Sequence, residues 1–168
     1  NTTGASNVSI GYQALDANTT ANGNTGVGYQ ALSANTTGAS NTAVGAYCLD
    51  ASNGDHNASF GYNSLSENTT GDNNTACGRS ALANNTTGTQ NTAIGRGALD
   101  SNTTTSYNTA VGRSALEANT AEHNTAVGRN ALAANTTGTY NTAVGAECAD
   151  ALTTGGQNTA VGYAALDA

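Results

Sequence analysis

The sequence predicts an all-β or mainly β fold, a β-solenoid (parallel β-roll) built from ten coils. One unit recurs along the whole chain: Asn-Thr-Ala-Val-Gly, two variable residues, Ala-Leu, and a turn such as Asn-Thr-Thr-Gly. The glycine of this unit returns every 17 residues, with two steps of 16. A fixed short period predicts repeats that each form one coil, stacked on the next. These glycines are Gly11, Gly28, Gly45, Gly61, Gly78, Gly95, Gly112, Gly128, Gly145 and Gly162.

Composition supports one repeat domain over residues 1–168, expected to be a segment of a longer or stacking fibre. The chain has no Pro, Met or Trp, and its net charge is −7 with only four basic residues. A surface for nucleic acid is therefore not expected, because binding phosphates needs clustered positive charge. No apolar run reaches membrane-spanning length, so no membrane insertion is expected.

Each coil is expected to begin with a short strand, as at residues 125–127. The position before each phase glycine is apolar in every coil, and we predict that this column faces inward. Side chains alternate along a strand, so the residue two positions earlier, usually Thr, should also face inward. The small residue between them, such as Ala126, should then face outward and form a flat outer surface.

The Ala-Leu pair that follows the glycine is expected to supply a second inward-facing segment. Two structures fit this segment. Helix-forming residues and pairs such as Arg113 with Glu117 at i,i+4 favour a short helix. A second short strand is the alternative. The remaining residues, rich in Asn, Thr and Gly, are expected to form a turn.

The three cysteines are predicted to be buried and unreactive. Cys48 and Cys148 replace the inward Ala of the Ala-Leu pair, and Cys77 replaces the apolar strand residue. No nucleophile-base pair, zinc spacing, phosphate loop or calcium repeat is present, so we expect neither an enzyme nor a bound metal or cofactor.

One column carries all the basic side chains and is the first candidate for binding a partner. It follows the phase glycine, and like charges in adjacent coils would lie about 5 Å apart. Such a row suits an anion or an acidic partner, and its Tyr members could contact sugars or another subunit. A plain solvated row is the alternative. The candidate residues are Tyr12, Tyr29, Tyr62, Arg79, Arg96, Arg113, Arg129 and Tyr163.

Two further rows lie in the turns. Asn-x-Thr sequons could carry N-glycans in a secreted protein, although turn capping explains the same residues. Paired threonines, as at Thr36-Thr37, could form an ice-binding array, although a turn is a doubtful place for a flat surface. The sequon residues are Asn18, Asn35, Asn68, Asn85, Asn102 and Asn135.

The repeat resembles two groups of fibrous proteins. The stretch Asn7-Val8-Ser9-Ile10-Gly11 is similar to the head repeats of trimeric autotransporter adhesins. The full unit, as in Asn91-Thr92-Ala93-Ile94-Gly95 followed by Ala98-Leu99, looks more like repeats of phage and bacterial tail-fibre-type proteins. The resemblance covers all ten coils. It implies a left-handed parallel β-roll packed as a trimer.

These observations predict a structural or adhesive fibre segment of an extracellular filament, a cell-surface adhesin or a viral tail fibre. Its expected location is extracellular, at a cell surface or on a virion. Self-association is expected, as a trimer or a head-to-tail filament, with a glycan or cell-surface receptor as a possible partner. An ice-binding solenoid and a carbohydrate-binding module are the alternatives.

Overall fold

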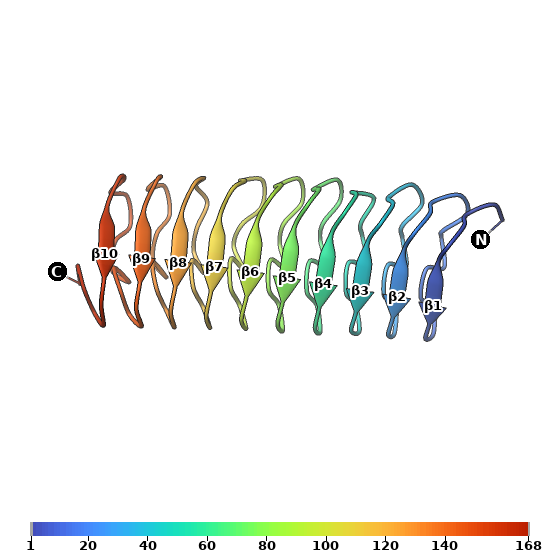
Figure 1. Ribbon diagram of the computed structural model, residues 1–168, viewed down its shortest axis with the longest axis horizontal. Coiled ribbons are helices and arrows are strands. Elements are labelled where there is room, and N and C mark those ends of the chain that lie inside the picture. The colour runs from blue at the N-terminus through green and yellow to red at the C-terminus, as the bar shows by residue number, and fades with distance from the viewer. Residues whose placement is uncertain (1, 168) are drawn as a thin grey trace.

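The computed structural model describes residues 2–167 and shows a straight β-solenoid rod (Figure 1). The described ends of the chain lie at opposite ends of the rod, and each coil contributes one three-residue strand. The strands are β1 (Val8–Ile10), β2 (Thr25–Val27), β3 (Thr42–Val44), β4 (Ala58–Phe60), β5 (Thr75–Cys77), β6 (Thr92–Ile94), β7 (Thr109–Val111), β8 (Thr125–Val127), β9 (Thr142–Val144) and β10 (Thr159–Val161).

The ten strands form one parallel sheet in sequence order, from β1 to β10. Every strand pairs with the next in the same register, so Thr109 lies beside Thr125 and Val111 beside Val127. β-Branched residues favour this extended backbone. Identical register places each sequence column in one straight line along the rod, and the predicted fold class is confirmed.

The expected direction of the strand side chains was wrong by one residue. From β2 to β10 the middle residue is buried, while the residues on either side of it are half-buried or exposed. The small column therefore faces the core, and the Thr and Val columns face outward.

The thin interior of the coil explains this direction. The core contains the middle strand column and the Ala-Leu pairs, with leucines such as Leu82 and Leu99 fully buried. A Cβ placed on Gly26 would already lie 3.3 Å from Cγ of Leu15 and 3.2 Å from the carbonyl oxygen of Ala31. A Val side chain at this position would overlap both. The small size of the column is therefore a requirement of the interior.

The Ala-Leu segment forms neither of the two expected structures. Within residues 2–167 it is a run of turns with no helix and no second strand. In this segment every second residue has a positive φ angle. Leu99 and Leu116 both have φ of 52°, in the left-handed region that a leucine rarely adopts. This alternation lets the Leu99 N–H donate to the Ala115 carbonyl of the next coil at 3.0 Å. The inward direction of Ala and Leu was predicted correctly.

The phase glycines allow adjacent coils to approach each other closely. Gly95 has φ of 133°, and a Cβ on it would lie 2.4 Å from the carbonyl oxygen of Gly112. Because real Cβ atoms do not approach carbonyl oxygens this closely, only glycine fits.

A ladder of buried asparagines joins the coils immediately before the strands. The backbone N–H of Asn108 donates to Oδ1 of Asn91 at 3.0 Å, and that of Asn124 donates to Oδ1 of Asn108 at 3.0 Å. Nδ2 of Asn91 donates to the Thr105 carbonyl of the turn at 2.9 Å. Each rung therefore pairs a buried backbone N–H with a buried side-chain amide.

Two of the three cysteines lie where they were expected. Cys48 and Cys148 are fully buried, and burial raises the pKa of the Cys48 thiol to about 11. Cys77 is exposed, so the prediction that it is buried was wrong. It occupies the Val column, and the same one-residue error in strand direction explains the difference.

Candidate functional site

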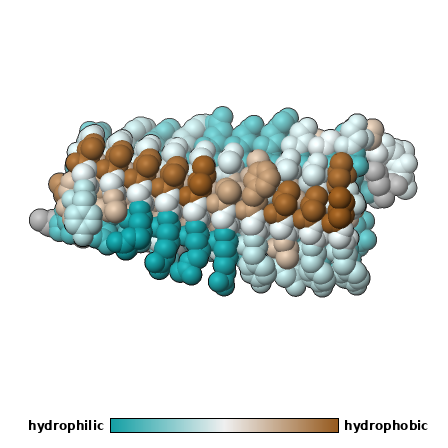
Figure 2. Space-filling model, turned by 60° about the horizontal axis from the view of Figure 1, so that its bottom comes forward, coloured by the Kyte–Doolittle hydropathy of each residue, from teal (hydrophilic) through white to brown (hydrophobic). Residues whose placement is uncertain are grey.

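The outward side of the sheet carries an apolar stripe along the whole rod. We call this column the valine stripe: Ile10, Val27, Val44, Phe60, Cys77, Ile94, Val111, Val127, Val144 and Val161. Eight of the ten are exposed, as in the 42% exposed Ile94 and the 37% exposed Val127. Figure 2 shows the stripe as a continuous hydrophobic band. An apolar band this long is characteristic of a contact surface.

A second outward column runs parallel to the valine stripe and is mostly threonine. Its members are half-buried or exposed, as at Thr92 and Thr125. Together the two columns form what we call the strand face. Neither column contains an acidic or basic residue. The strand face is therefore an uncharged surface on a protein whose net charge is −7.

The Tyr/Arg column lies beside the strand face and forms one ordered row. At its N-terminal end Tyr12 stacks on Tyr29 with ring centroids 5.4 Å apart. Tyr47 comes from the neighbouring column, where its coil has alanine, and contacts Tyr29 and Tyr62 edge to face. The guanidinium of Arg79 then lies 6.0 Å from the ring centroid of Tyr62. The sequence did not indicate the part played by Tyr47.

In the C-terminal part of the row, an acidic side chain takes the place of the Tyr or Arg that one coil lacks. Where the column has Ala146, the next residue, Glu147, forms an ion pair with Arg129. The pKa of Tyr163 is raised, first by its hydrogen bond to Glu147. Four of the eight predicted partner-binding residues are the arginines, and all eight lie along this row. In both coils where this column has alanine, the large side chain of the next residue, Tyr47 or Glu147, therefore joins the row.

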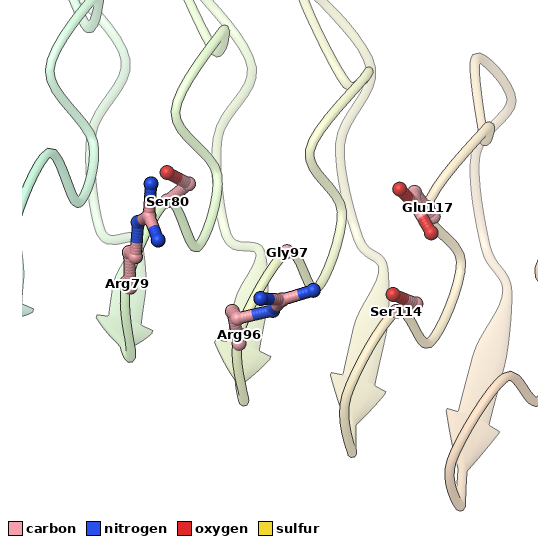
Figure 3. Close-up of a pocket in the computed structure, with 6 residues that line it drawn as sticks. All are labelled: Arg79, Ser80, Arg96, Gly97, Ser114 and Glu117. Atoms are coloured by element: carbon pink, nitrogen blue, oxygen red, sulfur yellow. The ribbon is translucent and has the colours of Figure 1, made fainter.

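A shallow groove of about 250 Å³ lies at the arginine part of the row (Figure 3). Arg79 and Arg96 extend from adjacent coils, and small residues lie beside them. The groove is lined by Arg79, Ser80, Arg96, Gly97, Ser114 and Glu117. In residues 2–167 the only ion pair within 4.0 Å joins Arg129 to Glu147, so Arg79, Arg96 and Arg113 carry charge without a paired carboxylate.

The sequon asparagines do not fit the role of glycan carriers in the folded rod. All six predicted residues are buried, at 1% exposure or less. Nδ2 of Asn68 donates to the Gly71 carbonyl, and Nδ2 of Asn85 donates to Gly88. A glycan on this nitrogen would have to occupy the core. Turn capping, the alternative explanation, matches these contacts.

The paired threonines of the turns are exposed or half-buried, but their hydroxyls are partly occupied. Oγ1 of Thr69 donates to the Thr86 carbonyl of the next coil at 3.0 Å, and Oγ1 of Thr86 donates to that of Thr103 at 3.0 Å. These side chains therefore connect coils along the turn edge.

A second aromatic row was not recognised from the sequence. His123 stacks between Tyr107 and Tyr140 with centroid distances of 4.9 and 4.8 Å. The three residues share one column, in which Tyr107, His123 and Tyr140 all have positive φ. Aligning this column would have revealed the row.

Fold and surfaces together define a β-solenoid repeat protein with an apolar strand face and a basic row beside it. Comparison with protein-family models, with curated proteins and with solved structures finds no match for this chain. In the described range, no helix could cross a membrane. Nor do residues 2–167 bring three His, Cys, Asp or Glu side chains together as a metal site.

Proposed function

We propose that this chain is a structural fibre segment whose strand face packs against further copies of the same chain. The observation that carries the proposal is the exposed valine stripe, which lies on one side of every coil. Covering apolar area releases about 25 cal/mol for each Å² removed from water. A rod that packs through this side would extend the buried core of each coil by an intermolecular layer.

The distribution of charge along the coil supports another copy of this chain as the partner. Two rods with a net charge of −7 repel each other, and most of the acidic side chains lie in turns and in the segment after Leu. The strand face is the side on which like-charged rods can approach without facing carboxylates. Because the face is uncharged and repeats in every coil, it is complementary to itself.

Cys77 provides a native probe of this packing. It is exposed in the valine stripe, in the fifth of the ten strands. Parallel copies around a common axis would bring the same coil of each copy to the same height. Mild oxidation of the assembled protein should therefore yield a covalent dimer through Cys77.

The matched control moves the thiol away from the strand face. A Cys77→Ser/Thr87→Cys variant places the only exposed thiol on the turn edge, where Thr87 is exposed. This variant should remain uncrosslinked under the same conditions. If the native protein gave no covalent dimer, or the control dimerised equally well, the parallel packing of strand faces would be wrong.

Ice binding is the second candidate, because the inward direction expected for the strand threonines, which would have hidden them from ice, was wrong. The strand threonines point outward, on a regular parallel sheet with strands about 4.8 Å apart. However, the neighbouring valine stripe includes Phe60, Cys77 and Ile94, whose different sizes break the regularity that an ice lattice requires. The fibre proposal needs no such uniformity. Thermal hysteresis of the monomeric protein at millimolar concentration would favour ice binding.

A further inference from the structure

We propose that Arg79, Arg96 and Arg113 form a binding site for a linear acidic polysaccharide, which lies along the rod. This site is separate from the strand face and does not depend on self-association. Its ligand class is a chain of uronate or sulfated sugars.

The first argument is the unpaired charge of the three arginines. All four basic residues of the protein lie in consecutive coils of one column, and only Arg129 has a carboxylate partner in the described part. Arg79, Arg96 and Arg113 are exposed and repeat at about one strand spacing, where like charges repel. An external anion relieves this repulsion, and guanidinium groups bind carboxylate and sulfate groups through paired hydrogen bonds.

The surface beside the three arginines has a shape that also supports the proposal. The residue that follows each arginine is small: Ser80, Gly97 and Ser114. At the same position the two flanking coils carry the larger Asn63 and Asn130, and the coils beyond them carry Tyr47 and Glu147. The groove therefore opens beside Arg79 and Arg96, and its walls offer hydroxyl groups that suit sugar hydroxyls. Figure 3 shows Arg79 and Arg96 bordering this opening.

The third argument is the spacing of the charges. The arginines advance by about 4.8 Å per coil. Phosphates on one strand of B-DNA advance by about 3.4 Å along the helix axis. Same-side residues of an extended acidic peptide are two residues apart, about 6.6 Å. Neither a nucleic-acid strand nor an extended acidic peptide matches the advance of the arginines, so the acidic polysaccharide is the ligand class that we propose.

Glu117 is the one acidic side chain that lines the groove. Its negative charge lies close to the path of the ligand and weakens anion binding. This residue provides a test in the opposite direction, because Glu117→Gln should strengthen binding while leaving the arginines in place.

The experiment measures binding of the full chain, in its native assembly state, to polygalacturonate and heparin oligosaccharides by isothermal titration calorimetry. We expect both to bind with an affinity that falls as salt rises. The triple variant Arg79→Gln/Arg96→Gln/Arg113→Gln should bind at least tenfold more weakly, since hydrogen bonds to charged groups are lost. Glu117→Gln should bind more tightly. Arg129→Gln is the matched control and should change the affinity less than about twofold, because Arg129 is already paired.

Four outcomes would overturn the proposal. These are no binding of either acidic chain, equal binding of neutral dextran, equal binding of a single-stranded oligonucleotide, and an unchanged affinity in the triple variant. All four arginine positions are exposed, so an unchanged melting temperature should confirm that each variant is folded. The two acidic chains also identify the anionic group that is recognised. Binding of heparin alone indicates sulfate, and binding of polygalacturonate alone indicates carboxylate.

Discussion

Ala126 and Val127 are neighbours in β8 and face opposite sides of the sheet: Ala126 is 0% exposed and Val127 is 37% exposed. Replacing Ala126 with Asp should unfold the rod locally or completely, because it buries a charge without a partner, at a cost of about 3–5 kcal/mol. Replacing Val127 with Asp should cost about 1 kcal/mol or less under monomeric conditions. Thermal denaturation followed by circular dichroism compares the two. Equal destabilisation would contradict the strand direction described above.

The phase glycines from Gly11 to Gly145 should tolerate no side chain. Gly95→Ala would place a Cβ 2.4 Å from the Gly112 carbonyl oxygen and should disrupt the stack at that coil. Gly97→Ala is the control, since its φ is also positive at 66° and its nearest neighbouring atom lies 3.9 Å away. We expect it to cost about 1–2 kcal/mol. Urea denaturation of both variants measures the difference, and similar midpoints would show that coil contact at Gly95 is not tight.

The asparagine ladder should contribute measurably to stability. Asn91→Ala removes the acceptor for the Asn108 N–H and leaves that buried group without a partner. We expect a loss of about 1–3 kcal/mol. Asn84→Ala removes an exposed hydrogen bond to the Asp100 carbonyl and should cost less than about 0.5 kcal/mol. Equal effects in a denaturation experiment would argue against the ladder.

Stability should decrease as pH rises through about 6. Burial raises the pKa of Asp50 to about 6. A carboxyl whose pKa is raised on folding binds its proton more tightly in the folded state, so its contribution is complete below the unfolded pKa of about 4 and is lost above 6. Asp50 is half-buried, so solvent screening limits the effect to about 1 kcal/mol. Melting temperatures from pH 4 to 7.5 should fall for the native protein and change less for Asp50→Asn.

Periodicity was sufficient to predict the solenoid, a short strand in each coil and the inward Ala-Leu pairs. It could not determine strand direction, because both the apolar column and the small column are uniform along the chain. The interior width decides between them, and it depends on how deeply leucines such as Leu82 enter the coil. The left-handed backbone at these leucines was also beyond sequence reasoning, since such a conformation is uncommon for leucine and is stabilised here by contacts with the next coil.

The candidate surfaces were predicted in part. The Tyr/Arg column was visible because its residues share one position in the repeat, whereas Tyr47 and Glu147 join it from the adjacent position. The burial of the sequon asparagines could not be predicted, because a motif of three residues says nothing about burial. Asn102, for example, is 0% exposed.

We propose that copies of this chain pack through the strand face. Sedimentation velocity of the native protein and of an Ile94→Asp/Val127→Asp variant, both at about 50 µM, measures whether this packing occurs. Both positions are exposed, so the variant should keep its circular dichroism spectrum. We expect an elongated oligomer for the native protein and a folded monomer for the variant. A native protein that sediments as a monomer, or a variant that remains fully oligomeric, would contradict it.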